Sequence, residues 1–232
     1  MCTYRNYCHH IWQNLQLKFK ETGLRELFWD AARAPNVHAF EHAMQKIRST
    51  HVQAHAYLQL LEPASWAFHA MDSKVKCEHI TSNCMESFNA WIADERSKPS
   101  ISMLELVRTK IMELIYTRAQ IASRWTKSIT LDGLGRIKLL NRVARHARVL
   151  RSGAYEFEVE LNTVRVVVQL DDLHCDCGEW ELRGIPCVHG VACINTIRAD
   201  VSAYCSSYFT TEKWRASFAA VVHPIRSSNY WP

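Results

Sequence analysis

The spacing of apolar residues is helical from the start of the chain to about residue 62. One stripe, made of Phe40, Met44 and Ile47, predicts a helix over residues 38–50. Pro63 interrupts this pattern, and an irregular connector is expected after it, over residues 66–76. The first part of the chain is therefore expected to be a group of short helices.

Helical periodicity resumes at Asn83 and stops at Pro99, because proline does not continue a helix. Ser102, with Glu105 three residues later, has the pattern of a capping box, which predicts the beginning of a long helix. The two glycines at 133 and 135 are expected to separate this helix from the next one.

A last helix is predicted to extend as far as residue 151. Its buried face is expected to consist of Leu140, Val143, Ala147 and Leu150. Its outer face would carry four arginines, Arg142, Arg145, Arg148 and Arg151. This arrangement predicts an amphipathic helix with one strongly basic side.

At Gly153 the period of the pattern changes from helical to alternating. Two apolar runs, 155–161 and 164–170, flank Asn162-Thr163, which is typical of a β-hairpin. Apolar positions from Val191 onward predict a helix that packs on this hairpin. The expected fold class is α+β, with a mainly helical N-terminal two-thirds followed by a small ββα unit.

Charge is unevenly distributed along the 232 residues, although the net charge is only +5. Residues 96–151 hold 13 Lys and Arg against 3 acidic residues, so this segment has a net charge of +10 and the remainder has −5. A basic segment on an otherwise acidic chain favours a polyanion as partner, although a solvated helix face explains the charge equally well.

The location of the protein is inferred from what the sequence lacks. No apolar run reaches the roughly 18 residues of a membrane span, and the first residues do not resemble a secretory signal. We therefore expect an intracellular, reducing compartment and no membrane partner. In that setting the nine cysteines are expected to be metal ligands or buried thiols rather than disulfides.

Four potential metal ligands follow the hairpin: Cys175, Cys177, Cys187 and His189. Residues two apart on an extended chain point to the same side, so the first pair can share one ion. On a regular helix the second pair would diverge by about 200°, which places it in the turn after Pro186 that leads into a helix.

Three thiolates and one imidazole form the closed tetrahedral set that a structural Zn²⁺ prefers. Such a set leaves no open position for a catalytic water. His174 and Cys193 are rival ligands, and a thiol in the position of Cys193 is more often a buried apolar side chain.

The Cys-x-Cys-x9-Cys-x-His pattern, with Trp180 and Gly184-Ile185-Pro186 between its pairs, resembles a SWIM-type zinc finger. The surrounding chain is similar to the C-terminal part of plant Mutator-like transposases. Three stretches carry that resemblance: Ser65-Trp66-Ala67, residues 79–92 with Glu86-Ser87-Phe88-Asn89, and the tail from Tyr208 to Pro232.

The resemblance implies four regions. They are a helical region at 1–70, a second one at 71–151 with the Glu-Ser-Phe-Asn motif and the basic helices, a SWIM finger at 152–200, and a tail at 201–232. It also implies nuclear residence and contact with DNA or another protein. Arg142, Arg145, Arg148 and Arg151 would then bind phosphates. No small-molecule substrate is expected.

In that family Glu86 corresponds to the last acid of a DDE triad in an RNase H-like fold, whose other two acids lie on strands. The aspartates that precede it here are Asp30 and Asp72, and no strand is predicted near either. Because one carboxylate cannot organise two Mg²⁺ ions, we expect a non-catalytic zinc protein in which Glu86 is vestigial. The alternatives are a DDE transposase part that contributes Glu86 to Mg-dependent DNA strand transfer, and a protein-binding adaptor.

Overall fold

The computed structural model describes residues 8–20, 22–74, 76, 83–226 and 230, with the side chains of 83–86 excepted. The chain divides into two compact units. The first unit joins residues 1–82 to 133–206, and the second joins 83–132 to 207–232. In the described part of the chain, no helix is long and apolar enough to cross a membrane.

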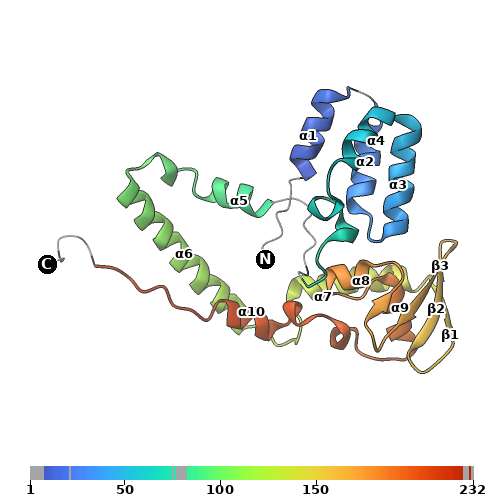
Figure 1. Ribbon diagram of the computed structural model, residues 1–232. Coiled ribbons are helices and arrows are strands. Elements are labelled where there is room, and N and C mark those ends of the chain that lie inside the picture. Colours follow the sequence, from blue (N-terminus) through green and yellow to red (C-terminus); the bar gives the residue numbers. More distant parts are fainter. Residues whose placement is uncertain (1–7, 21, 75, 77–82, 227–229, 231–232) are drawn as a thin grey trace. The chain divides into compact units, whose positions relative to one another are not determined.

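Among the described residues, the N-terminal part of the first unit forms four helices, which Figure 1 labels α1 to α4. They are α1 (Cys8–Lys18), α2 (Leu24–Arg33), α3 (Val37–Thr50) and α4 (Val52–Gln59). The helix predicted over residues 38–50 is confirmed to within one residue. One face of each helix contributes to a shared core, in which Leu15, Phe28, Ile47 and Leu58 are buried.

The described part of the irregular connector predicted over residues 66–76 contains one short 3-10 turn, η2 (Phe68–Ala70), and a second one, η1 (Pro63–Ser65), precedes it. Trp66 between them is fully buried, and its ring stacks on Phe28 with 5.5 Å between centroids. The connector therefore closes the helical core.

A four-stranded antiparallel sheet forms the other part of the first unit, with strand order β1-β2-β3-β4. The strands are β1 (Arg148–Arg151), β2 (Glu156–Leu161), β3 (Val164–Gln169) and β4 (His174–Cys175). Two helices, α8 (Glu179–Arg183) and α9 (Val188–Thr196), and the turn η4 (Val201–Tyr204) follow. This sheet, after a mainly helical region, confirms the α+β class.

The predicted hairpin is confirmed as β2 and β3. Asn162 and Thr163 both have positive φ, 48° and 69°, as a two-residue turn requires to match the twist of the strands. In the resulting register Phe157 faces Val168 and Val159 faces Val166, and all four side chains are buried. The predicted helix packs as α9 against this face, with Val191 and Ile194 buried (Figure 1).

The basic helix predicted as far as residue 151 is wrong in its extent. The helix α7 (Leu131–Ala144) includes Gly133 and Gly135 and ends at Ala144, after which Arg148–Arg151 is the strand β1. Pairing of Val149 with Val159 of β2 supplies the backbone hydrogen bonds that a longer helix would have made. The first strand therefore begins at Arg148, whereas the sequence pattern places the first strand after Gly153.

The predicted buried face of that helix is also wrong. Val143 is 48% exposed and Leu150 is 43% exposed, whereas Ile137 and Ala144 are the buried residues near the end of α7. The buried residues of α7 are Gly133, Ile137 and Ala144, which are four and seven residues apart and so share a different face of the helix from Val143.

The second unit contains α5 (Asn83–Trp91), η3 (Glu95–Ser97), α6 (Ser100–Ser123), η5 (Ser207–Phe209) and α10 (Thr211–Ser217). The capping box is wrong, because α6 begins at Ser100 directly after Pro99 and places Ser102 inside its first turn. Glu105 instead forms an ion pair with Arg108 on the same helix.

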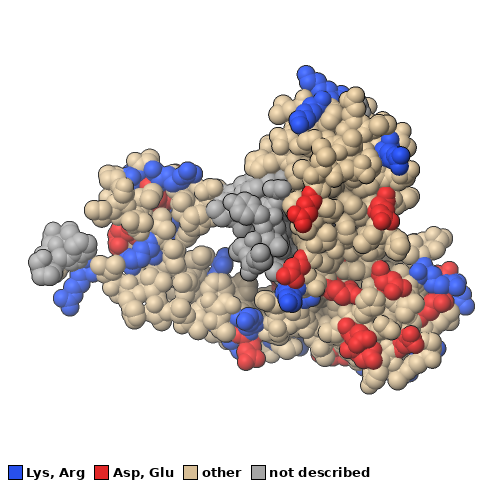
Figure 2. Space-filling model, in the orientation of Figure 1, with Lys and Arg blue, Asp and Glu red and all other residues tan. Residues whose placement is uncertain are grey.

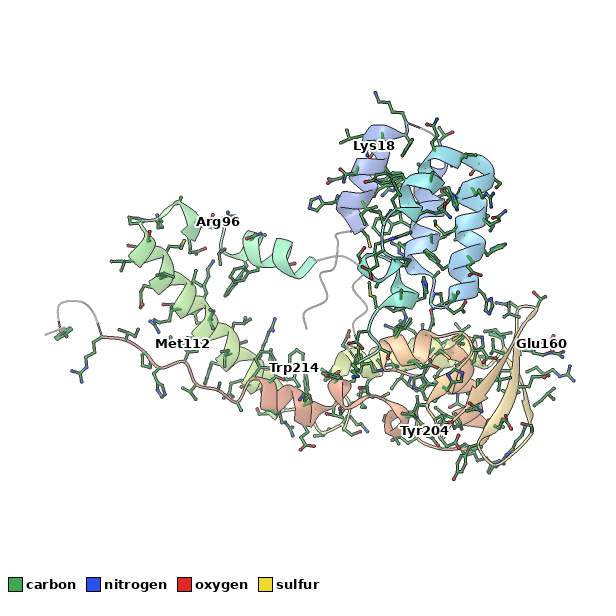
Figure 3. The ribbon with its side chains drawn as sticks, viewed as in Figure 1. Lys18, Arg96, Met112, Glu160, Tyr204 and Trp214 are labelled. Carbon is green, nitrogen blue, oxygen red and sulfur yellow. The ribbon has the colours of Figure 1, made fainter. Side chains whose placement is uncertain are left out.

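The C-terminal segment of the second unit packs against the end of α6. Arg215 of α10 donates hydrogen bonds to the carbonyls of Ala122 (3.0 Å) and Trp125 (2.7 Å). The neighbouring residue Trp214, labelled in Figure 3, lies 5.5 Å from the ring of Trp125. These contacts hold α10 and α6 together as one small unit.

Candidate metal centre

The four predicted ligands lie together in the first unit. Cys175 ends β4 and Cys177 follows in the turn after it, whereas Cys187 is the N-cap of α9 and His189 lies in its first turn. Their ligand atoms are all within 4.8 Å of one another. The placement of the second pair at the entry of a helix is as the sequence predicts.

The distances suit a tetrahedral ion. The Nδ1 atom of His189 lies 3.7 Å from the Sγ of Cys175 and 3.8 Å from the Sγ of Cys187. With Zn–S near 2.3 Å and Zn–N near 2.0–2.1 Å, a tetrahedral site requires about 3.6 Å between a sulfur and a nitrogen ligand. These two separations are therefore close to those of a tetrahedral Zn²⁺ site, with Nδ1 as the atom that His189 offers.

The electrostatic environment favours a thiolate before any metal binds. Hydrogen bonds from the Cys175 and Cys177 thiols lower the pKa of Cys187 well below its usual value. The backbone N–H of Gly190 also points to the Cys187 sulfur, at 3.4 Å. Hydrogen bonds with Cys177 and Cys187 raise the pKa of the Cys175 thiol. A thiolate at the start of a helix is a ligand poised for a cation.

The two rival ligands lie outside the cluster. Cys193 is fully buried, and this burial raises the pKa of its thiol to about 12. His174 instead interacts with two carboxylates, Asp176 at 3.5 Å and Glu181. Cys193 is therefore the buried apolar side chain that the sequence favours.

Two glycines allow the metal-binding loops to pack closely. Gly178 has a φ of +76°, and a Cβ at this position would lie 2.3 Å from the carbonyl oxygen of Pro35. A Cβ at Gly190 would lie 2.8 Å from the ring of Trp180. Trp180 itself is buried and donates from Nε1 to the carbonyl of Tyr204, which Figure 3 labels, at 3.3 Å.

Sequence reasoning missed two groups that support the ligands. The backbone N–H of Cys175 donates to Glu181 Oε1 at 3.1 Å. The side-chain amide of Asn36 donates to the carbonyl of Cys177, also at 3.1 Å. Nothing in the sequence links Asn36 to a residue 141 positions later.

The four arginines expected to bind phosphate do not share one helix. Arg142 is on α7 and Arg145 directly follows it, and both are exposed, whereas Arg148 and Arg151 lie on β1. Arg148 forms an ion pair at 3.8 Å with Glu160 of β2, which Figure 3 labels. Arg151 donates to two backbone carbonyls of the following turn. On the face shown in Figure 2, the part of the molecule that holds the sheet carries mainly acidic side chains, with basic ones toward the outer edge of the sheet.

Glu86 lies on α5 in the second unit, and its side chain is outside the described part of the structure. Asp30 lies on α2 and Asp72 lies in the connector, where it accepts a hydrogen bond from the N–H of Lys74 (2.9 Å). Among the described residues, the zinc cluster is the one group of three or more potential metal ligands.

The comparisons with known proteins agree with this geometry. Residues 164–197 match the family model of the SWIM zinc finger, a span that runs from β3 through α9 and includes all four ligands. No curated protein and no solved structure matches the chain. The chain therefore contains a SWIM zinc finger, whose Cys175, Cys177, Cys187 and His189 lie together as a site suited to Zn²⁺.

Proposed function

We propose that this chain is a non-catalytic DNA-binding module, derived from a Mutator-like transposase and stabilised by structural zinc. A bound ion would join the loop after β4 to the start of α9, and with four protein ligands it would have no open position for a water. Such a cross-link stabilises a sheet-and-helix unit that is too small to hold a large core by itself. Its place of action would be the nucleus, as the resemblance to transposases implies.

The observation that carries DNA binding is a basic stripe at the end of α7. Lys138 and Arg142 are four residues apart and so lie on the same side of α7, and Arg145 directly follows the end of this helix. All three are exposed, and none forms an ion pair within the described part of the chain. This stripe replaces the four arginines as the proposed phosphate contact, since Arg148 and Arg151 have partners inside the protein.

Phosphate contacts make binding sensitive to salt and nearly independent of DNA sequence. Neutralising three phosphates predicts that affinity falls about 40-fold as salt rises from about 50 to about 200 mM. Fluorescence anisotropy with a labelled duplex at both salt concentrations measures this fall.

The matched variants separate the stripe from its neighbours. We expect replacement of Lys138, Arg142 and Arg145 by Gln to remove most of the affinity. Replacement of Arg148 and Arg151 by Gln should leave it nearly unchanged. The opposite ranking, or binding that ignores salt, would contradict DNA contact through α7. Zinc content must be the same in all variants.

The non-catalytic part of the proposal rests on the location of the strands. In the described residues all strands lie between 148 and 175, so neither Asp30 nor Asp72 lies on one. A DDE site would require a second polypeptide or further sequence to bring two strand aspartates to Glu86. Cleavage of DNA by this chain alone in the presence of Mg²⁺ would contradict the proposal and favour the transposase alternative.

The second unit favours the adaptor as a second candidate function. Ile101 of α6 is 79% exposed, Tyr116 is 66% exposed and Leu104 is 63% exposed. A groove of about 460 Å³ also lies between α6 and residues 218–222. Apolar surface of this kind is more typical of protein contact than of DNA contact. An adaptor would show weak DNA binding that the α7 replacements leave unchanged.

A further inference from the structure

The loop between the two ligand pairs is held by the N-terminal helical part of the same unit. Lys76 donates to the carbonyl of Glu181 in α8, and Leu182 of α8 is buried in a small cluster with Phe68 and Met71. The guanidinium group of Arg183 lies over the Phe68 ring, 5.2 Å from its centroid. The N-terminal helical part thus contacts the loop between the two ligand pairs through the residues of α8.

Asn36 makes the contact closest to a metal ligand. It is the N-cap of α3, where its Oδ1 accepts from the N–H of Ala39 at 2.8 Å. Because Oδ1 must face that donor, the amide nitrogen faces the other way, and it donates to the carbonyl of Cys177 at 3.1 Å. One half-buried side chain therefore joins the start of α3 to the backbone of a zinc ligand.

Close packing reinforces this hydrogen bond. Pro35, the residue before Asn36, lies so near to Gly178 that no side chain fits between them. Gly178 is also held by its N–H, which donates to the carbonyl of Cys175 at 2.8 Å. The peptide between Cys177 and Gly178 is consequently fixed from both sides.

We infer that Asn36 is a positioning residue for the zinc site. Its amide fixes the carbonyl of Cys177, so that the Cys177 sulfur is held toward Cys175, Cys187 and His189 before the ion arrives. A ligand already in place loses less conformational freedom on binding, which raises affinity for the metal. The inference rests on zinc binding by the SWIM finger and extends it to a residue of the helical region.

The Asn36→Ser variant tests the inference. Serine is as good an N-cap as asparagine, so α3 should keep its stability, but its hydroxyl is too short to reach Cys177. We expect the zinc dissociation constant, measured in the full chain by competition with a chromophoric chelator, to rise about fivefold, the worth of one typical hydrogen bond. A second variant, Asn36→Asp, keeps the cap and turns the donor into an acceptor, so its loss should be at least as large.

One further measurement and one control variant separate a positioning role of Asn36 from an effect on the stability of the whole chain. Cobalt(II) bound in place of zinc reports ligand geometry, and its visible bands should change in Asn36→Ser. The control Thr210→Ala removes the N-cap of α10 in the second unit, where the Thr210 hydroxyl accepts from the backbone N–H of Lys213. It should change neither the zinc affinity nor the cobalt bands.

Equal zinc affinity and equal cobalt bands in the wild type and Asn36→Ser would overturn the inference alone. A wild-type chain that takes up no zinc would overturn the zinc site, and the inference with it.

Discussion

The ring of Trp180 lies directly over Gly190, so that the short helix α8 and the first turn of α9 meet without an intervening side chain. A Cβ at Gly190 would lie 2.8 and 2.9 Å from two ring carbons of Trp180, and 3.4 Å from Pro186. Because Trp180 is buried, its ring cannot move aside. The absence of a side chain at Gly190 therefore sets how closely α8 packs against the first turn of α9, which carries His189.

This contact predicts that Gly190→Ala destabilises the finger. The added methyl group overpacks the site, and we expect the free energy of unfolding to fall by about 2 kcal/mol. Chemical denaturation of the zinc-loaded protein measures the change. The matched control is Gly135→Ala on α7, because a Cβ at this position would meet nothing within 4 Å. This substitution should stabilise the helix by about 0.5–1 kcal/mol. Equal effects of the two substitutions would refute the packing argument.

Replacing any zinc ligand should abolish stoichiometric metal binding. We expect Cys175→Ser and Cys187→Ser to lose the single zinc ion and the stable fold of the sheet and α9, because three donors bind zinc far more weakly than four. Cys193→Ala removes a buried thiol outside the cluster and should retain the ion. Mass spectrometry measures the zinc content of each variant, and circular dichroism measures whether its fold is retained. Zinc retained in the ligand variants would show that the ion binds elsewhere.

The thiol of Cys8 should be inert in the native protein. It is fully buried and donates to the carbonyl of Trp66 at 3.1 Å, and burial raises its pKa to about 12. A raised pKa keeps the thiol protonated until the pH approaches that value, so almost no reactive thiolate exists near pH 8. Alkylation followed by peptide mapping should label Cys8 only when denaturant is present. Rapid labelling in the native state would place it at the surface.

The hairpin turn should gain stability from glycine. Thr163 has a φ of +69°, a conformation that is costly for a β-branched residue and free of strain for glycine. We expect Thr163→Gly to raise the free energy of unfolding by about 1 kcal/mol. Thr163→Val keeps the branched side chain and should bring no gain. A thermal denaturation series compares the three proteins, and a loss of stability in the glycine variant would argue against a strained turn.

The features that the sequence by itself determined depend on residues close together in the chain. The turn at Asn162-Thr163 and the alternation around it specify a hairpin, since both strands lie within a few residues of the turn. The spacing of Cys175 and Cys177, and that of Cys187 and His189, likewise specifies two pairs of ligands for one ion, because the geometry of a strand and of a helix entry acts over two residues.

Only the tertiary structure decided features that depend on distant partners. Arg148–Arg151 follows a helical pattern closely enough to be read as helix, yet it forms a strand because the edge of β2 supplies its hydrogen bonds. Ser102 has the pattern of a helix cap, yet α6 begins earlier, after Pro99.

The contact of Asn36 with Cys177 joins positions 141 residues apart, and only the packing of the helical part against the finger brings them together. Local rules describe what a segment can form, whereas burial and unpaired backbone groups in the rest of the chain select among those possibilities.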